Sequence, residues 1–312
     1  MGRIKKLKGW SNEIFITRDE KLAALISRNT VYVYDLDTRE IIFQTKTALS
    51  NTSEAVISKD RKVLAAKNTS GTLVIISMET GEEICRNAMA KTEGFKMTFA
   101  EDDRSVLDFD GDGRTMLLTQ DGQYTILDGP EPKKRKESLP SVYLRYDTYT
   151  KQIYKFMYDH PDFNGNFVLI SSAEKDHISY EVLRRIQGTF PNHIWGLSFC
   201  KEHIFYLVKD ESTDKYSLIV CDRQFKQVDL IQLPLENIVK EGTSIWQMWV
   251  SPGEKYALIK PAVFMGNTYL LNLKTKELVR EFDYPYVYGF TMVKDDTVFL
   301  ISTWEGTYVG EL

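Results

Sequence analysis

The chain between positions 245 and 282 contains four short runs in which apolar and polar residues alternate. These runs are Ile245–Val250, Lys255–Lys260, Asn267–Leu273 and Glu277–Phe282. Tyr, Val, Leu and Trp are frequent in them, and the turn-forming sequence Ser-Pro-Gly-Glu separates the first two. The pattern predicts a small antiparallel sheet of four β-strands. Such a sheet buries both faces only when a neighbour packs on each side, so the pattern favours a chain that repeats this unit.

The rest of the chain does repeat it, with a period of roughly 40–50 residues, which is typical of propeller blades. The first two copies align closely: EIFITRDEKLAALISRNTVYVYDLDTREIIFQ (13–44) lies beside EAVISKDRKVLAAKNTSGTLVIISMETGEEICR (54–86). Further copies begin near positions 95, 141, 194, 245 and 287. The fourth diverges most, and its strands are expected near Ser141–Asp147, Gln152–Tyr158, Asn166–Ser172 and Ile178–Arg184. Sustained helical periodicity is absent from the sequence, which argues against a helical repeat protein.

The last copy ends after three strands, while Arg3–Lys8 precedes the first copy without a partner of its own. Pairing of Arg3–Lys8 with Gly306–Gly310 would complete the last sheet and remove the free edges of an open array. We therefore expect an all-β fold: a seven-bladed β-propeller of four-stranded antiparallel blades, closed by the N-terminal strand, in a single domain of residues 1–312. Six or eight blades are alternatives, because the fourth copy is divergent.

Several short motifs resemble those of known repeat families. The turns Ser-Pro-Gly-Glu-Lys (251–255) and Ser-Lys-Asp-Arg-Lys (58–62) are similar to the Ser-Pro-Asp-Gly-Lys turn of YVTN-type and WD-repeat-like β-propellers. Tyr-Asp-Leu-Asp-Thr-Arg-Glu (34–40) and Leu-Asn-Leu-Lys-Thr-Lys-Glu (271–277) resemble the sequence that ends a blade in these families. The paired Gly-His and Trp-Asp dipeptides of true WD repeats are missing, so the resemblance is to a divergent propeller. It implies a rigid disc whose top face or central channel holds a protein, peptide or small ligand; a minority of such proteins are enzymes.

The composition of the chain argues against some classes of partner and of cellular location. The net charge of −4 argues against a surface built for nucleic acid. The three cysteines, Cys85, Cys200 and Cys221, lie far apart without metal-ligand spacing, which is typical of buried thiols in a reducing compartment. The sequence has neither the apolar core of a signal peptide nor an apolar run long enough to span a membrane. We expect a cytoplasmic monomer that binds no cofactor, nucleic acid or membrane.

Aromatic residues recur at one place in the repeat. Alignment of the first strands brings together Asn12, Ser53, Phe95, Val142, Trp195, Trp246 and Tyr288. By the geometry of the resembled family, these positions lie near the mouth of the central channel, where aromatic side chains would form a stiff contact surface. The candidate binding residues are Phe95, Trp195, Trp246, Tyr284, Tyr286 and Tyr288. The alternative is that these aromatic side chains pack between blades as core.

Three other features have simpler interpretations. Asp108, Asp110 and Asp112 with Gly113 resemble the start of a calcium loop, but the later ligand positions hold Met116 and Thr119, so a hairpin turn without metal is preferred. The basic run Lys133–Lys136 is expected to be a solvated loop, although a nuclear-import signal or an acidic partner would also fit. His160, His177, His193 and His203 have no ligand spacing, and we expect surface or structural roles for them.

The sequence contains no nucleophile elbow, phosphate-binding loop or dinucleotide fingerprint. The leading hypothesis is therefore a non-catalytic scaffold that binds a protein or peptide at the top face and channel mouth. Two alternatives remain open: a channel-site enzyme of the hydrolase, lactonase or lyase type, and a carbohydrate- or small-ligand-binding propeller that uses Trp195, Trp246 and Tyr288 as stacking platforms.

Overall fold

The computed structural model describes residues 4–88, 97–100, 102–110, 113–129, 141–158, 166–172, 181–186, 196–210, 213, 215–235, 244–262, 266–284 and 286–312. The regular structure of these residues consists of β-strands in four-stranded antiparallel sheets, which confirms the all-β prediction. Within the same ranges, the chain forms no helix of the length and hydrophobicity that a membrane crossing requires. The chain divides into two compact units, Lys8–Arg185 and Met1–Leu7 with Ile186–Leu312.

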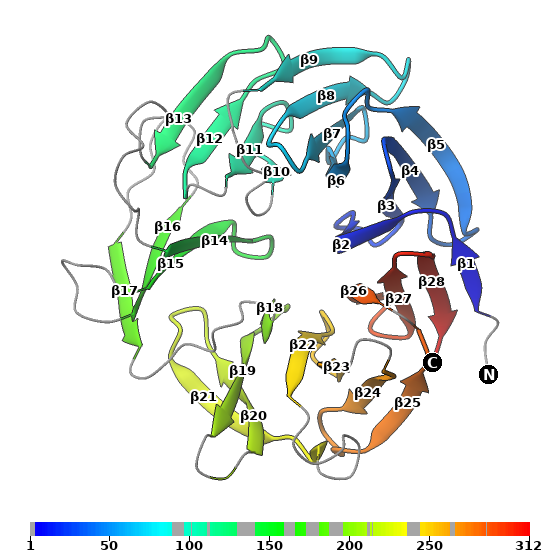
Figure 1. Cartoon of the computed structure of the whole chain (residues 1–312). Coiled ribbons are helices and arrows are strands. Elements are labelled where there is room, and N and C mark those ends of the chain that lie inside the picture. The colour runs from blue at the N-terminus through cyan, green and yellow to red at the C-terminus, as the bar shows by residue number, and fades with distance from the viewer. Residues whose placement is uncertain are drawn as a thin grey trace. The chain divides into compact units, whose positions relative to one another are not determined.

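The unit Lys8–Arg185 contains four sheets, each formed by four strands in chain order (Figure 1). The first comprises β2 (Trp10–Ile16), β3 (Leu22–Ser27), β4 (Thr30–Asp35) and β5 (Glu40–Lys46). The second comprises β6 (Thr52–Ile57), β7 (Val63–Asn68), β8 (Leu73–Ser77) and β9 (Glu83–Asn87). The third comprises β10 (Met97–Phe99), β11 (Val106–Phe109), β12 (Thr115–Leu118) and β13 (Tyr124–Asp128). The fourth comprises β14 (Ser141–Asp147), β15 (Gln152–Tyr158), β16 (Asn166–Ser172) and β17 (Glu181–Ile186).

The second unit contains three sheets. The fifth sheet of the chain comprises β18 (Leu197–Phe199), β19 (Ile204–Asp210), β20 (Lys215–Cys221) and β21 (Gln227–Gln232). The sixth comprises β22 (Ile245–Val250), β23 (Tyr256–Pro261), β24 (Thr268–Asn272) and β25 (Leu278–Phe282). The seventh comprises β26 (Val287–Val293), β27 (Val298–Thr303), β28 (Gly306–Glu311) and, outermost, β1 (Lys5–Leu7).

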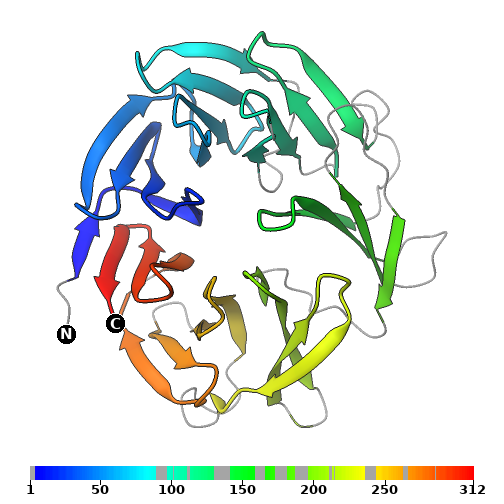
Figure 2. The same cartoon turned by 180° about the vertical axis from the view of Figure 1, so that it is seen from behind.

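The first residues of the chain pair with the last strand, as the missing fourth strand of the last copy predicted. β1 lies antiparallel beside β28, with Lys5 opposite Val309 and Leu7 opposite Thr307 (Figure 1, and from behind in Figure 2). Gly306 makes this close approach possible, because a Cβ there would come within 2.6 Å of the Leu7 carbonyl oxygen. The fourth copy also follows the predicted bounds for its first three strands, and only its last strand differs, at Glu181–Ile186.

Apolar side chains fill the space between successive sheets within each unit. One buried cluster joins the first and second sheets through residues such as Val33, Leu64 and Val74. Others join the second to the third sheet and the third to the fourth. In the other unit, Leu218 and Met248 belong to the cluster between the fifth and sixth sheets, and a further cluster joins the sixth to the seventh. Both faces of an inner sheet are therefore buried, as the repeat pattern predicted.

The turns between first and second strands share one construction. In the first sheet the Thr17 hydroxyl donates to Asp19 and accepts the Leu22 N–H, and in the second Ser58 does the same with Asp60 and Val63. The residue after the aspartate has positive φ: Glu20 at 57° and Arg61 at 60°. Side-chain hydrogen bonds to the backbone hold these turns without the glycine that the resembled motif has at this position.

In the sixth sheet the aspartate of this turn is replaced by Gly253, and a carboxylate of the next sheet takes its place. Asp296 accepts the Ser251 hydroxyl at 2.5 Å and the N–H groups of Gly253 and Lys255 at 3.1 and 3.2 Å. A Cβ on residue 253 would lie 2.7 Å from Asp296 Oδ2. The glycine is therefore required because a buried carboxylate occupies the space of its side chain.

Gly253→Ala should lower the free energy of unfolding by about 1–3 kcal/mol, because the added methyl group must displace Asp296. In an Asp296→Ala background the same substitution should cost nothing further. Gly122→Ala is the matched control: position 122 has open space but a φ of +83°, so its cost should be unchanged by Asp296→Ala. Denaturant unfolding of the five variants measures these differences, and equal costs of Gly253→Ala in both backgrounds would contradict the interpretation.

Candidate functional site

Three of the positions that the repeat alignment brought together share an irregularity of the first strand. The strand register shifts between Thr52 and Glu54, between Ile245 and Gln247, and between Val287 and Gly289. The residues inside these shifts are Ser53, Trp246 and Tyr288. A bulge of this kind turns a side chain away from the regular alternation of the strand. The alignment is thus confirmed for these three positions, whereas Phe95 and Trp195 lie outside the described residues.

Four aromatic residues gather at the sixth and seventh sheets: Trp246, Tyr286, Tyr288 and Trp304, referred to here as the aromatic cluster. The ring of Trp304 is nearly parallel to those of Tyr286 and Tyr288, with centroids 5.1 and 5.4 Å away. Trp304 is 60% exposed and Trp246 is 37% exposed. Exposed aromatic side chains that adjoin one another, unlike single scattered ones, are a feature of binding surfaces.

Trp304 was not among the residues expected from the sequence. Thr303 pairs with Gly306, so Trp304 and Glu305 form the two-residue turn between β27 and β28. The Thr303 hydroxyl accepts the Glu305 N–H at 3.2 Å, and Gly306 has a φ of +141°. The sequence signal was available: a tryptophan in a tight turn projects from the sheet and cannot belong to the core between sheets.

A buried lysine lies beneath the aromatic cluster. Lys260 Nζ is 4.8 Å from the centroid of the Trp246 ring and 5.4 Å from that of Tyr288. The same ammonium donates to the Val287 carbonyl oxygen at 2.9 Å. Burial lowers the pKa of Lys260 to about 8, because the charged form loses hydration. Aromatic faces offset part of this loss by cation–π attraction.

Tyr284, the remaining candidate, lies apart from the aromatic cluster. Its ring stacks on Tyr308 with centroids 4.1 Å apart and on Phe282 at 5.6 Å. The ring of Tyr308 is in turn covered by Lys6 of β1, whose Nζ lies 5.4 Å from the Tyr308 centroid. Tyr284 therefore supports the packing of the last sheet.

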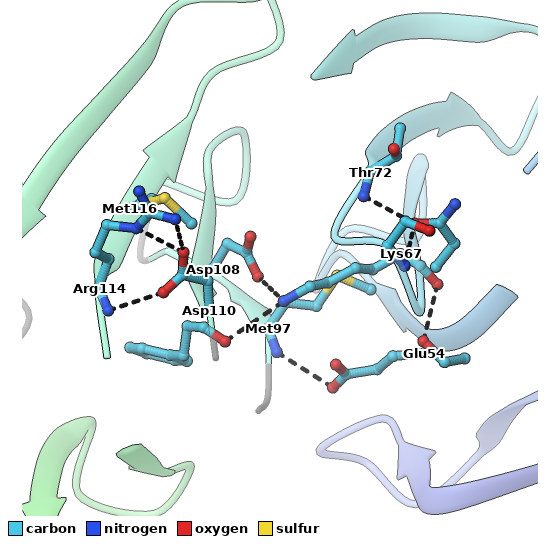
Figure 3. Close-up of polar contacts among 12 residues, drawn as sticks. Glu54, Lys67, Thr72, Met97, Asp108, Asp110, Arg114 and Met116 are labelled. Carbon is cyan, nitrogen blue, oxygen red and sulfur yellow. Dashed lines mark hydrogen bonds and ion pairs between the residues drawn. The ribbon is translucent and has the colours of Figure 1, made fainter. Parts of the chain in front are cut away.

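A second buried lysine occurs in the other unit, at the second and third sheets. Lys67 of β7 forms an ion pair with Asp108 of β11, and both side chains are almost completely buried (Figure 3). Asp110 of the same sheet pairs with Arg114, whose Nε donates to Oδ2 at 2.6 Å. Burial raises the pKa of the Asp108 carboxyl, and the ammonium of Lys67 opposes this shift.

These contacts bear on the loop that resembles a calcium site. Asp108 and Asp110 face an ammonium and a guanidinium, which neutralise the carboxylates that a calcium ion would need. Asp112 lies outside the described residues, as do Lys133–Lys136 and His160, His177 and His193. His203 is described, and its Nδ1 lies 2.8 Å from Glu254 Oε2 in the neighbouring sheet. Over the described ranges, His, Cys, Asp and Glu side chains form no cluster of three that could hold a metal ion.

Lys67 and Lys260 occupy the same place in their sheets. Each lies on the second strand, opposite the residue that follows the bulge, Glu54 or Gln247. The residue that Lys67 meets in the next sheet is Asp108, two residues before the turn at Asp110. The corresponding residue of the last sheet is Ile301, two residues before the turn at Thr303. The two lysines are alike in position and burial. They differ in that Lys67 has a carboxylate partner, Asp108, whereas the corresponding position for Lys260 holds Ile301.

Comparison with known proteins supports the fold of the chain but does not identify a function for it. No protein-family model matches the chain, and no curated protein matches its sequence. Many solved structures do match, 1598 chains in all. One is the β-propeller domain of Cps50 (Swd1) from Myceliophteria thermophila, which is 10% identical, covers 100% of both chains and has a TM-score of 0.68. The resemblance to β-propellers is thus confirmed for the fold, and at this identity no function follows from it.

Lys67→Met should destabilise the protein by about 3–5 kcal/mol, because it leaves the Asp108 carboxylate buried without its cation. Lys260→Met removes a buried ammonium without leaving such a carboxylate behind, so its effect should be near zero or stabilising. Denaturant unfolding measures the free energy of unfolding of both variants and of the wild-type chain. The double variant Lys67→Met/Asp108→Leu is the control and should recover most of the loss. A similar cost for both single variants would contradict the assignment.

Proposed function

We propose that this protein is a non-catalytic scaffold that binds a polypeptide partner through the aromatic cluster. The observation that carries the proposal is the exposure of Trp304 beside the stacked rings of Tyr286 and Tyr288. Trp and Tyr dominate the binding energy of protein interfaces, because they offer large contact areas and lose little side-chain entropy on binding. Rings that are already stacked need no further ordering when a partner binds.

The proposal includes the arrangement of the sheets: seven blades in one closed propeller formed by a single domain. Three observations support it: seven four-stranded sheets within the described residues, the pairing of β1 with β28, and a solved propeller domain that matches over the full length. A ring is the arrangement in which every sheet gains two neighbours. Small-angle X-ray scattering should fit one disc-shaped particle, and a curve that requires two separated bodies would contradict it.

A carbohydrate ligand is the second candidate, since sugars also stack on exposed indole rings. The aromatic cluster offers the exposed indole of Trp304 for stacking, and its cation, Lys260, is buried. Sugar binding depends on several polar groups placed around a ring, whereas a polypeptide partner brings apolar side chains that match this surface. We therefore favour a polypeptide partner, in a cytoplasmic and monomeric protein.

Trp304→Ala should weaken binding of the partner at least tenfold without loss of stability, because the side chain is mostly exposed and carries the contact. The measurement is quantitative comparison of proteins captured from a lysate of the source organism by the wild-type chain and by the variant. Tyr149→Ala is the matched control, since Tyr149 is also an exposed aromatic residue but lies in the other unit. The proposal predicts at least one protein that the wild-type chain and Tyr149→Ala capture and that Trp304→Ala does not. If there is no such protein, the proposal is wrong.

A further inference from the structure

We propose that the partner segment inserts an acidic side chain beside the aromatic cluster and that its carboxylate pairs with Lys260. This inference rests on the proposed function and specifies the chemistry of the partner. Its basis is the comparison between two lysines at the same place in the repeat. Lys67 has its counter-ion, Asp108, within the chain, and the position of the last sheet that corresponds to Asp108 in the repeat is occupied by Ile301.

The ammonium of Lys260 is incompletely compensated in the free protein. It has three protons to donate, and the hydrogen bond recorded for it goes to the Val287 carbonyl oxygen. Its remaining contacts are with the rings of Trp246 and Tyr288. Among the described residues, no carboxylate lies within ion-pair distance of it. A buried charge in this state is costly, and an incoming carboxylate relieves the cost.

One of the two rings that contact this ammonium, that of Trp246, is itself exposed. The ring of Trp246 lies over Lys260 Nζ, and Trp246 is 37% exposed, so this indole contacts both the ammonium and solvent. Trp246 lies at a bulge, where the strand is locally irregular. The proposal requires the incoming acidic side chain to displace the ring of Trp246, and we expect the stacked rings of Tyr286, Tyr288 and Trp304 to stay in place.

The surroundings favour a carboxylate on a polypeptide over other anions. A single ammonium offers a point charge, whereas phosphate groups are bound by several cations or by guanidinium forks. The aromatic rings around Lys260 match the apolar residues that flank an acidic side chain in a peptide. The chain as a whole carries a net charge of −4, so general attraction does not draw acidic partners to it. Recognition must therefore come from the local pairing with Lys260 and from the apolar contacts.

The experiment uses the full-length chain and a phage-displayed library of random dodecapeptides, with removal of phage that also bind Trp304→Ala. The selected peptides should contain Asp or Glu next to an aromatic or aliphatic residue. Synthetic forms of the tightest peptide are then titrated by calorimetry. Replacing its acidic residue by the amide should weaken binding to the wild-type chain at least tenfold, and to Lys260→Met no more than twofold. Lys260→Arg should retain the preference for the acid.

The outcomes separate this inference from the proposed function. Peptides that depend on Trp304 but bind equally well as acid and amide would overturn the carboxylate pairing and leave the scaffold function intact. An equal loss in wild-type and Lys260→Met chains would place the acid elsewhere and also overturn it. Failure to recover any Trp304-dependent peptide would count against the proposed function itself. If Lys260→Met fails to fold, Lys260→Gln takes its place in the comparison, and equal binding of acid and amide peptides by the wild-type chain still overturns the pairing.

Discussion

Burial of both faces of each small sheet is the constraint on which the rest of this structure depends. A four-stranded sheet of five- or six-residue strands cannot be stable by itself in water, because too little apolar surface leaves solvent. Each sheet here reaches a stable state through clusters such as the one that joins Leu218 to Met248 across two sheets. The turns follow the same logic: Asp296 and Glu254 accept backbone N–H groups from the turn of the preceding sheet. Neighbouring repeats are thus joined by packing in the middle and by hydrogen bonds at the turns.

Repetition of one sheet also repeats its buried positions, and these positions can acquire polar residues. Once a lysine stands opposite the bulge, its ammonium lies between two sheets and must be compensated there. The second sheet solves this with an aspartate from the third, and the sixth with a carbonyl oxygen and two aromatic rings. In the second sheet the ion pair of Lys67 and Asp108 neutralises the ammonium within the chain and stabilises the fold. The arrangement in the sixth sheet leaves capacity for an external ligand, and it lies next to the most exposed tryptophan among the described residues.

Much of the fold could be predicted from the sequence because it rests on local signals. Alternation and turn residues placed strands such as Ile245–Val250 and Ser141–Asp147 at their observed bounds. The unpaired first residues indicated the pairing of β1 with β28. The candidate site was harder, since side-chain partners depend on which residues of neighbouring sheets meet. Trp246, Tyr286 and Tyr288 were named as candidates from the sequence, whereas Trp304 was overlooked in its turn, and the stacking of Tyr284 on Tyr308 has no signal in the sequence. The ion pair of Lys67 and Asp108 joins residues 41 positions apart, a contact that neither repeat alone could reveal.

The two lysines also show why function in a repeat fold is best sought in departures from the repeat. Residues that follow the common pattern, such as Thr17 and Ser58 in their turns, are explained by the needs of each sheet. A residue that breaks the pattern without a benefit to its own sheet needs another explanation. Exposed Trp304 and the ammonium of Lys260, which has no carboxylate partner among the described residues, are two such departures, and both belong to the same pair of sheets. Their proximity makes one cause, a bound partner, a simpler explanation than two independent defects in an otherwise regular core.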